Sequence, residues 1–223
     1  MKKLIWSLSF FLVAFMNAQN VVFNKVEKTH QNEDKFLYKI ENTKEAFYLG
    51  EIEVQGFSNN DVEVFDKIYK KAKEIGANTF KFKPFEGING TQNFDPHHYK
   101  LSFYYIPKEE IPVQQGKIFI FSSEDKAQKV RVNKNDFELS SRSYKEILVE
   151  AGKTYEISTK KLFGSSVKFL VKENQPAQYF QIFSNNLKFG NESNPGLIFK
   201  SGDIISLEKS FAEFLTIIYK KKK

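Results

Sequence analysis

Residues 46–83 read AFYLGEIEVQGFSNNDVEVFDKIYKKAKEIGANTFKFK, and they contain the clearest structural pattern in the chain. Its first ten residues have strand character, because Ile52 and Val54 alternate with polar side chains as in a half-buried strand. Residues 61–75 instead repeat apolar side chains every three or four positions, which predicts an amphipathic helix. Thr79–Lys83 alternates again. The stretch therefore predicts a strand, a helix and a second strand in series.

The predicted helix has recognisable ends. Asn60 or Asp61 can cap its start by accepting hydrogen bonds from backbone N–H groups of the first turn. Gly76 stands where a left-handed residue commonly ends a helix. Lysines occupy the other faces and the C-terminal end, where the helix dipole favours cations. The face expected to be buried consists of Val64, Phe65, Ile68, Tyr69, Ala72 and Ile75.

The segments on either side add strands to this block. A polar loop at residues 29–34 separates two short strands, the second over Lys35–Glu41. After the block, a loop rich in Gly, Asn and Pro at residues 84–98 leads into an aromatic strand at residues 99–106. Together these elements predict an N-terminal α+β domain.

The second half of the chain has a different pattern. Two prolines within residues 107–112 predict a linker, so the boundary is expected near residue 113, between an α+β domain of residues 19–113 and a second domain of residues 114–223. Short apolar runs separated by turn residues predict that this second domain is an antiparallel β-sandwich. The runs are Lys117–Phe121, Lys129–Val132, Asp136–Leu139, Lys145–Val149, Thr154–Ser158, Val167–Val171, Tyr179–Phe183 and Ile204–Leu207.

The C-terminal segment combines an apolar stretch with a basic run. Phe211, Phe214, Leu215 and Ile218 fall at helical spacing within Glu208–Tyr219, which favours a helix, although Phe214–Tyr219 also fits a strand. Lys220–Lys223 is expected to be a solvated tail, with contact to an anionic surface as the alternative.

A series of short motifs runs through the second half of the chain: Gly116–Phe121, Val130–Asn133, Ser143-Tyr144 with Glu146–Gly152, Phe169–Val171 and Tyr179–Ile182. Through these motifs, residues 117–183 resemble the exported bacterial β-domains of the DUF2846-type family. Two departures from the family pattern occur, because Ser122-Ser123 stands where the family usually has an arginine, and Ala151-Gly152 stands where it tends to have a Pro-Gly turn. The family has no established activity, so the resemblance implies a fold and a compartment but no reaction.

The block from Tyr48 to Asn78 is similar to small bacterial envelope domains in which a helix ends in an Ala-x-x-x-Gly-Ala-Asn pattern. Heavy-metal-binding-like and stress-sensor lipoprotein domains share this layout. The pattern has a structural explanation, because Gly76 would end the helix, Ala77 would pack closely and Asn78 would enter the next strand. Metal binding does not transfer, since no matching ligand set is visible.

Residues 1–18 have the features of a secretory signal peptide. Lys2 and Lys3 precede an apolar run from Leu4 to Phe15, which is too short to span a bilayer, and Ala18 offers a cleavage site. The mature chain is therefore expected to be periplasmic or secreted. The sequence contains no cysteine, which excludes disulfides and a lipoprotein anchor, so no stable membrane anchor is expected after cleavage.

The charge of the chain gives little indication of its partner. Loss of Lys2 and Lys3 lowers the formal net charge from +7 to +5, and much of the remainder belongs to Lys220–Lys223. An exported protein with a nearly neutral body is not expected to bind nucleic acid. The expected partner is an unknown protein or glycan of the cell envelope.

No catalytic, cofactor-binding or metal-ligating residue is predicted. The histidines are His30, His97 and His98, and adjacent histidines on a strand point to opposite faces, so Asp95–His98 does not predict a metal site. Glu51 and Glu53 could form the carboxylate pair of a hydrolase, but a solvated strand face explains them more simply. Glu109 and Glu110 would pair only if the linker bends.

These observations predict a non-enzymatic, exported binding or structural module of the bacterial cell envelope, without cofactors. Two alternatives remain open at this point. One is an accessory or sensor subunit of an envelope system, suggested by the Gly-Ala-Asn block. The other is a hydrolase whose catalytic carboxylates the sequence does not identify.

Overall fold

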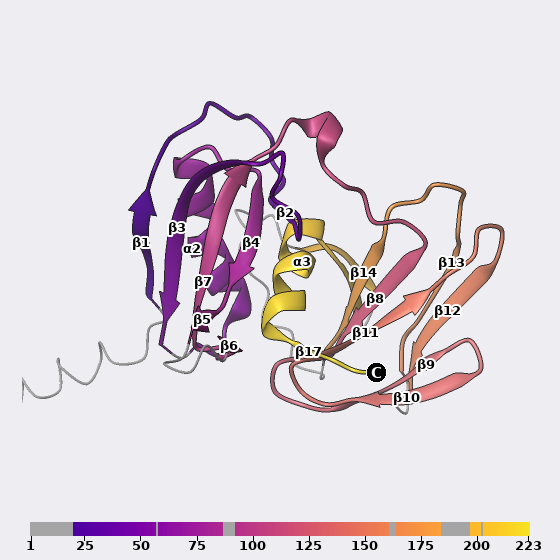
Figure 1. Ribbon diagram of the computed structural model, residues 1–223. Helices are drawn as coiled ribbons and strands as arrows, with labels where there is room; N and C mark the ends of the chain where they lie inside the picture. Colours follow the sequence, from indigo (N-terminus) through magenta and orange to yellow (C-terminus); the bar gives the residue numbers. More distant parts are fainter. Residues whose placement is uncertain (1–19, 57, 87–91, 161–163, 184–196, 202) are drawn as a thin grey trace, which may run out of the picture. The chain divides into compact units, whose positions relative to one another are not determined.

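A computed structural model describes the chain except for residues 1–19, 57, 87–91, 161–163, 184–196 and 202. The predicted signal peptide, residues 1–18, lies outside the described residues. The chain divides into two compact units (Figure 1). The first runs to Leu37 and resumes over Glu41–Ile106, and the second comprises Tyr38–Ile40 and Pro107–Lys223. The expected mixed α+β class with a sandwich-like, strand-rich body is confirmed.

The first unit is a sheet with helix α2 (Asp61–Glu74) against one face. Four strands of this sheet lie in the order β1 (Asn20–Val26), β3 (Phe47–Gln55), β7 (His98–Tyr105) and β4 (Thr79–Lys83), and these four are antiparallel to one another along that order. The predicted strand–helix–strand series is confirmed. Because β7 lies between β3 and β4, those two strands run parallel, and α2 connects them as a crossover. Two short strands, β5 (Phe85–Glu86) and β6 (Gln92–Asn93), pair within the predicted loop.

The ends of α2 are those the sequence predicts. The side-chain oxygen of Asn60 accepts from the backbone N–H of Glu63 at 3.2 Å, so Asn60 is the cap. Gly76 has a φ of 79°, and a Cβ there would lie 1.7 Å from the carbonyl oxygen of His30. Glycine is therefore required both by the backbone conformation and by the close approach of the N-terminal segment. Of the expected face, Tyr69 is only partly buried, whereas the rest is buried.

Asn78 joins the end of this block to the end of β7. Its side chain is buried, accepts from the backbone N–H of Ile106 at 2.9 Å and donates to the carbonyl oxygen of Ile106 at 2.7 Å. An apolar residue would leave both backbone groups unpaired, which explains an asparagine at this position in structural terms.

The second unit contains two sheets and helix α3 (Lys209–Ile218). The four-stranded sheet has the order β10 (Asn135–Leu139), β9 (Gln128–Val132), β12 (Thr154–Thr159) and β13 (Ser166–Leu170). The six-stranded sheet has the order β15 (Leu197–Ser201), β16 (Ile204–Leu207), β14 (Gln178–Ile182), β8 (Lys117–Phe121), β11 (Ser143–Leu148) and β17 (Lys220–Lys221). Each of the eight predicted runs corresponds to a strand. The sandwich is not wholly antiparallel, however, because β8 with β14 and β11 with β17 run parallel.

Strand β8 is buried on both faces, which explains its continuous apolar sequence. Ile118 and Ile120 belong to a core cluster that also draws residues from β9, β10, β12, β14 and β16. Phe119 and Phe121 point to the opposite face, where Phe119 stacks on Tyr179 with ring centroids 5.1 Å apart. The C-terminal segment forms helix α3, so the helix is confirmed and the alternative strand is not found. The apolar side chains that suggested the helix, Phe211, Phe214, Leu215 and Ile218, are buried.

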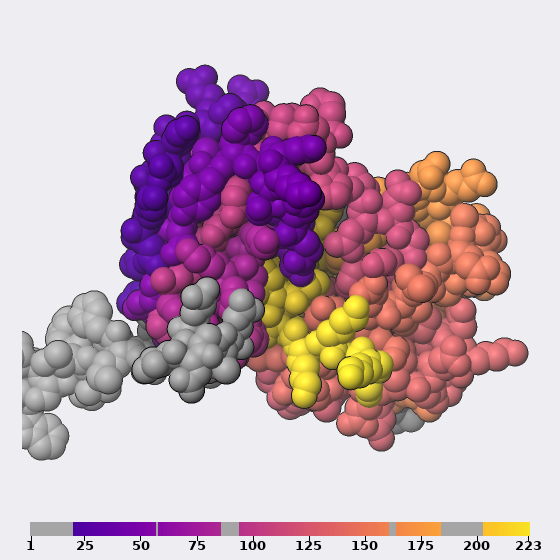
Figure 2. Space-filling model, in the orientation of Figure 1, coloured from indigo at the N-terminus to yellow at the C-terminus, as the bar shows by residue number. Residues whose placement is uncertain are grey.

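Three features of the second unit differ from expectation. The division falls at Ile106–Pro107, a few residues before the expected boundary near 113, and the linker there includes a short 3-10 helix, η1 (Lys108–Glu110). Strand β2 (Tyr38–Lys39) belongs to the second unit although it precedes the first-unit helix in the chain. Lys220–Lys223 is not a free tail, since its first residues form β17, although its side chains are exposed (Figure 2).

Candidate functional site

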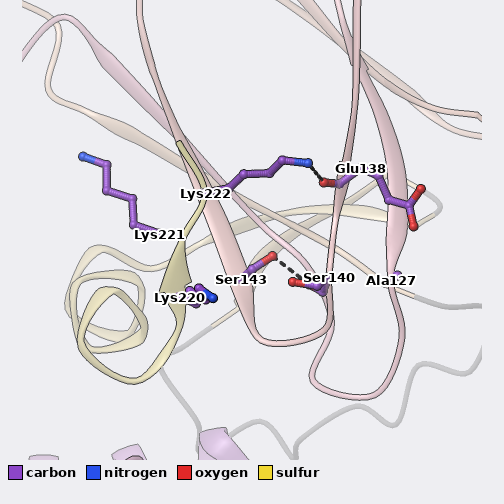
Figure 3. Close-up of a pocket in the computed structure, with 7 residues that line it drawn as sticks. All are labelled: Ala127, Glu138, Ser140, Ser143, Lys220, Lys221 and Lys222. Atoms are coloured by element: carbon purple, nitrogen blue, oxygen red, sulfur yellow. Dashed lines mark hydrogen bonds between the residues drawn. The ribbon is translucent and has the colours of Figure 1, made fainter. Parts of the chain in front are cut away.

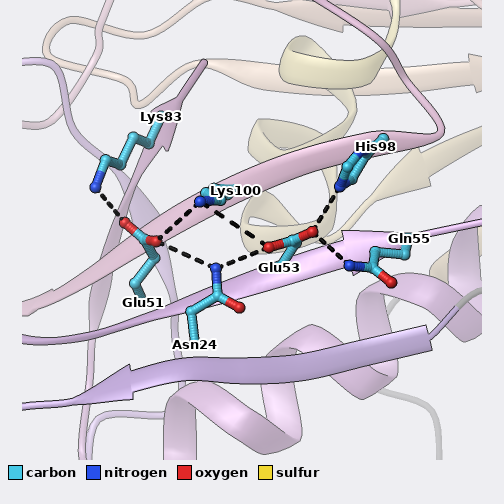
Figure 4. Close-up of polar contacts among 7 residues, drawn as sticks. All are labelled: Asn24, Glu51, Glu53, Gln55, Lys83, His98 and Lys100. Carbon is cyan, nitrogen blue, oxygen red and sulfur yellow. Dashed lines mark hydrogen bonds and ion pairs between the residues drawn. The ribbon is translucent and has the colours of Figure 1, made fainter. Parts of the chain in front are cut away.

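Polar residues gather on one face of the first-unit sheet (Figure 4). Phe23 lies beneath Lys71 of α2, with the ammonium 4.6 Å from the ring centroid, and it pairs with Ile52 on β3. Ile52 therefore faces α2, and its neighbours Glu51 and Glu53 point to the opposite face of the sheet. The residues that gather there are Asn24, Glu51, Glu53, Gln55, Lys83, His98 and Lys100.

Glu51 is a buried carboxylate held by cations from two other strands. Lys83 Nζ donates to its Oε2 at 2.5 Å, Asn24 Nδ2 donates to its Oε1 at 3.3 Å, and Lys100 Nζ lies 3.8 Å from Oε1. Burial opposes ionisation, but these hydrogen bonds outweigh it, so the pKa of Glu51 is lowered. The same contact raises the pKa of Lys83.

Glu53 is held ionised by a second set of donors. His98 Nε2 lies 2.6 Å from Glu53 Oε1, Gln55 also donates to Oε1, and Asn24 Nδ2 donates to Oε2 at 2.9 Å. These contacts lower the pKa of Glu53 to about 2, with the His98 contact the largest cause. A carboxylate pair that hydrolyses a glycoside needs one member protonated near neutral pH. Both pKa values are lowered here, so the pair lacks that general acid.

The remaining candidates from the sequence are not brought together. The ring of His30 lies against Tyr105 with centroids 3.8 Å apart, His98 contacts Glu53, and Asp95 accepts from the backbone N–H of His97 at 2.8 Å. Glu109 and Glu110 are exposed on the 3-10 helix η1. In the part of the chain that the structure describes, no three His, Asp or Glu side chains are placed to hold a metal ion.

A second candidate lies at the C-terminal end of the chain, where sequence reasoning placed a solvated tail. The backbone N–H of Lys220 donates to the carbonyl oxygen of Arg142 at 2.9 Å, and that of Lys222 donates to the carbonyl oxygen of Tyr144 at 2.7 Å. These bonds extend the edge of the six-stranded sheet along β11. The backbone from Lys220 to Lys222 is therefore held in an extended conformation beside β11.

A groove of about 380 Å³ lies beside this edge (Figure 3). The ammonium of Lys222 reaches across it and donates to the backbone carbonyl oxygen of Glu138 on β10, while Lys221 points away. Lys221 pairs with Glu146, which also contacts Lys117 Nζ at 2.6 Å, and hydrogen bonds from Lys117 and Lys221 lower the pKa of Glu146. The groove is lined by Ala127, Glu138, Ser140, Ser143, Lys220, Lys221 and Lys222.

Serine hydroxyls fix the floor of this groove. Ser122 Oγ donates to the carbonyl oxygen of Ser140 at 2.6 Å and accepts from the backbone N–H of Ser143 at 3.0 Å. Ser143 Oγ donates to the same carbonyl oxygen of Ser140 at 2.7 Å. Ser122 is buried and holds the turn between β10 and β11.

Glu213 is a buried carboxylate on α3 of the second unit, with 4% of its surface exposed. Its Oε2 accepts from the backbone N–H of Lys39 in β2 at 2.6 Å, and its Oε1 accepts from the hydroxyl of Tyr179 at 3.3 Å. Lys209 Nζ lies 3.8 Å from Oε1. Burial raises the pKa of Glu213 despite these partners, and burial beside Glu213 also raises the pKa of Tyr179. The group fastens β2 to α3 within the second unit.

Within the described residues, no helix combines the length and apolar character needed to cross a bilayer. The resemblances to exported β-domains and to small envelope domains stay predictions. In comparisons with known proteins, no family model, no curated protein and no solved structure matches this chain.

Proposed function

We propose that this chain is an exported, non-enzymatic binding module of the bacterial cell envelope that binds an anionic partner at its C-terminal lysine edge. The observation that carries the proposal is the placement of Lys220 and Lys222 beside a groove, on an extended segment whose backbone is hydrogen-bonded to the chain at Arg142 and Tyr144. A disordered tail loses conformational freedom when it binds, whereas lysines already held by backbone hydrogen bonds lose less. A cationic edge of this kind suits a partner that carries acidic groups.

The state of the first-unit carboxylates supports a role without catalysis. Glu51 and Glu53 have lowered pKa values and are saturated with hydrogen-bond donors. Groups in this state stabilise a fold well but exchange protons poorly at neutral pH. The cluster is therefore best explained as a structural ion network on one face of the first-unit sheet.

The test is binding of residues 19–223 to immobilised polygalacturonate, an acidic polysaccharide, with neutral dextran as the reference. We expect retention on polygalacturonate that weakens with salt, as contacts between exposed charges do. The double variant Lys220→Gln/Lys222→Gln should lose this retention. The control variant Lys28→Gln/Lys44→Gln removes the same charge from two exposed first-unit positions and should behave as the unmodified chain.

Two outcomes would contradict the proposal. Equal retention of the two double variants would show that net charge, and not the β17 edge, determines binding. Release of new reducing ends from polygalacturonate during incubation would show turnover and would favour the hydrolase alternative.

A further inference from the structure

We infer that the groove beside β17 is a binding site for a phosphate dianion, either free or as a phosphate monoester. This inference rests on the proposed binding role, because it names the anionic group that the lysine edge would hold. The site is built from the second unit alone, by β10, β11, the turn between them and β17.

The groove has more hydrogen-bond donors than acceptors. Lys220 and Lys222 are two apart on an extended segment, so their side chains leave the strand on the same side, opposite to Lys221. Of the three protons of Lys222 Nζ, one is used by the carbonyl oxygen of Glu138. Among the described residues, no acceptor is paired with the ammonium of Lys220. Such a surplus of N–H donors is what a phosphate group, which has only acceptor oxygens when fully ionised, would satisfy.

The groove faces a net charge of about +2, from the ammonium groups of Lys220 and Lys222. Lys221 is paired with Glu146 outside the groove. The carboxylate of Glu138 points away from the lysines, since only its backbone carbonyl faces them (Figure 3). Lys220 and Lys222 have no carboxylate partner in the described part of the chain. A dianion would neutralise both ammonium groups at once, whereas a single carboxylate or chloride would leave one charge uncompensated.

Ser140 and Ser143 form the floor of the groove. Ser143 is buried, and its hydroxyl donates its one proton to the carbonyl oxygen of Ser140. The free donors of the groove are therefore those of the lysine ammonium groups. The volume of about 380 Å³ exceeds that of a bare phosphate and lies in the range of pockets that hold small organic ligands. A phosphate monoester with an attached sugar would therefore fit.

The experiment is titration of residues 19–223 with inorganic phosphate, glucose 6-phosphate and glucose, followed by the amide resonances of Ser140, Ser143 and Lys222. Inorganic phosphate should shift these resonances, and chloride at equal ionic strength should not. Binding of glucose 6-phosphate that is tighter than that of inorganic phosphate would identify the monoester as the ligand. Equal binding of the two would identify the phosphate group itself. Glucose should not bind.

The variants localise the site. Lys220→Gln/Lys222→Gln should weaken phosphate binding about tenfold or more, since two charged contacts are lost. Lys220→Arg/Lys222→Arg should restore most of it, which shows that the fold of the edge is retained. Lys28→Gln/Lys44→Gln should leave the dissociation constant unchanged.

The outcomes separate this inference from the proposed function. Phosphate binding that is absent, or equal in the two glutamine variants, would overturn the phosphate site. If polygalacturonate retention still depended on Lys220 and Lys222 in that case, the binding role would stand without it. Phosphate binding at Ser140 and Ser143 without polygalacturonate retention would support the site and contradict the acidic polysaccharide partner.

Discussion

Glu53 and Glu213 should make the stability of this protein respond in opposite ways to pH. Glu53 is surrounded by donors, which favour its ionised form, and its pKa is about 2. Glu213 is shielded from water, which disfavours its ionised form and raises its pKa above the ordinary value of 4.5. A shift in pKa between the unfolded and folded chain is a contribution to the free energy of unfolding. The two residues therefore report on the two units separately.

For Glu213, the folded protein holds a proton that the unfolded chain has already lost at the same pH. Its contribution to stability is complete below pH 4.5 and is lost as the pH rises through the folded pKa. Glu213→Gln keeps an acceptor for Lys39 and removes the cost of a buried charge. We expect this variant to melt at a higher temperature than the unmodified chain at pH 7.5, with the difference vanishing near pH 4.5. The exposed Glu173→Gln is the control, and a lower melting temperature of Glu213→Gln at pH 7.5 would contradict the prediction.

For Glu53, the contribution has the opposite sign. It is complete above pH 4.5 and is lost as the pH falls through about 2, because protonation removes the contacts with His98 and Asn24. Glu53→Gln should lower the free energy of unfolding by about 1–3 kcal/mol at pH 7 and by much less at pH 2. Urea unfolding at both pH values measures this. A loss that is the same at pH 2 would mean that packing, not charge, explains the effect.

At the level of helices and strands, the sequence predicted the individual elements better than the pairing between strands. The apolar run in β8, the alternation in β12 and the spacing in α2 and α3 identify these elements, because each pattern depends on neighbours in sequence. Strand β17 was missed because four consecutive lysines give no alternation. Its position depends on backbone bonds to Arg142 and Tyr144, far away in the chain. The parallel pairing of β8 with β14 is likewise a property of the whole sandwich.

The buried face of α2 gives a direct test at this scale. Ile68 is 1% exposed, and Ile68→Ala should lower the free energy of unfolding by about 2–5 kcal/mol through lost burial and the cavity left behind. Lys70 lies on the exposed face, and its ammonium pairs with Asp66 at 2.6 Å. Lys70→Ala should therefore change stability by less than about 0.5 kcal/mol. Chemical denaturation of both variants measures the contrast, and similar losses at the two positions would mean that the helix face is wrongly assigned.

At the scale of the whole molecule, the groove could not be read from the sequence. Its lining comes from residues 127–143 and from the last lysines, and the fold alone brings these segments together. The Glu51–Glu53 cluster was easier to find, because two of its members are two apart on one predicted strand. Its partners Asn24, Lys83 and His98 come from three other strands and became visible only with the sheet order.

The predicted export concerns the whole molecule as well. The basic, apolar and small-residue pattern of residues 1–18 predicts cleavage after Ala18. Intact-mass analysis of the exported protein should therefore give a chain that begins at Gln19, in its amine or cyclised form. Replacement of Ala18 by Asp should block cleavage and retain the precursor. Full-length protein recovered from the membrane fraction of cells that make the unmodified chain would contradict the prediction.

The second unit is discontinuous in sequence, because Tyr38–Ile40 belongs to it while the residues on either side belong to the first unit. The backbone N–H of Lys39 donates a hydrogen bond to the buried carboxylate of Glu213, and this bond is shorter than the one from Tyr179. The ammonium of Lys209 lies 4.4 Å from the ring centroid of Tyr38. In a fragment of residues 107–223, Glu213 would lack the Lys39 donor. Leaving a buried acceptor without its partner lowers the free energy of unfolding by about 1–3 kcal/mol.

We expect this fragment to unfold at a lower temperature than the second unit does within residues 19–223. Glu213→Gln in the fragment should recover part of the loss at pH 7.5, since a neutral amide is less costly to leave unpaired than a carboxylate. Calorimetry of the fragment, its Glu213→Gln variant and the longer chain measures both effects. A fragment that matches the longer chain would show that β2 contributes nothing to the second unit, and a fragment that Glu213→Gln does not improve would show that its instability has another source.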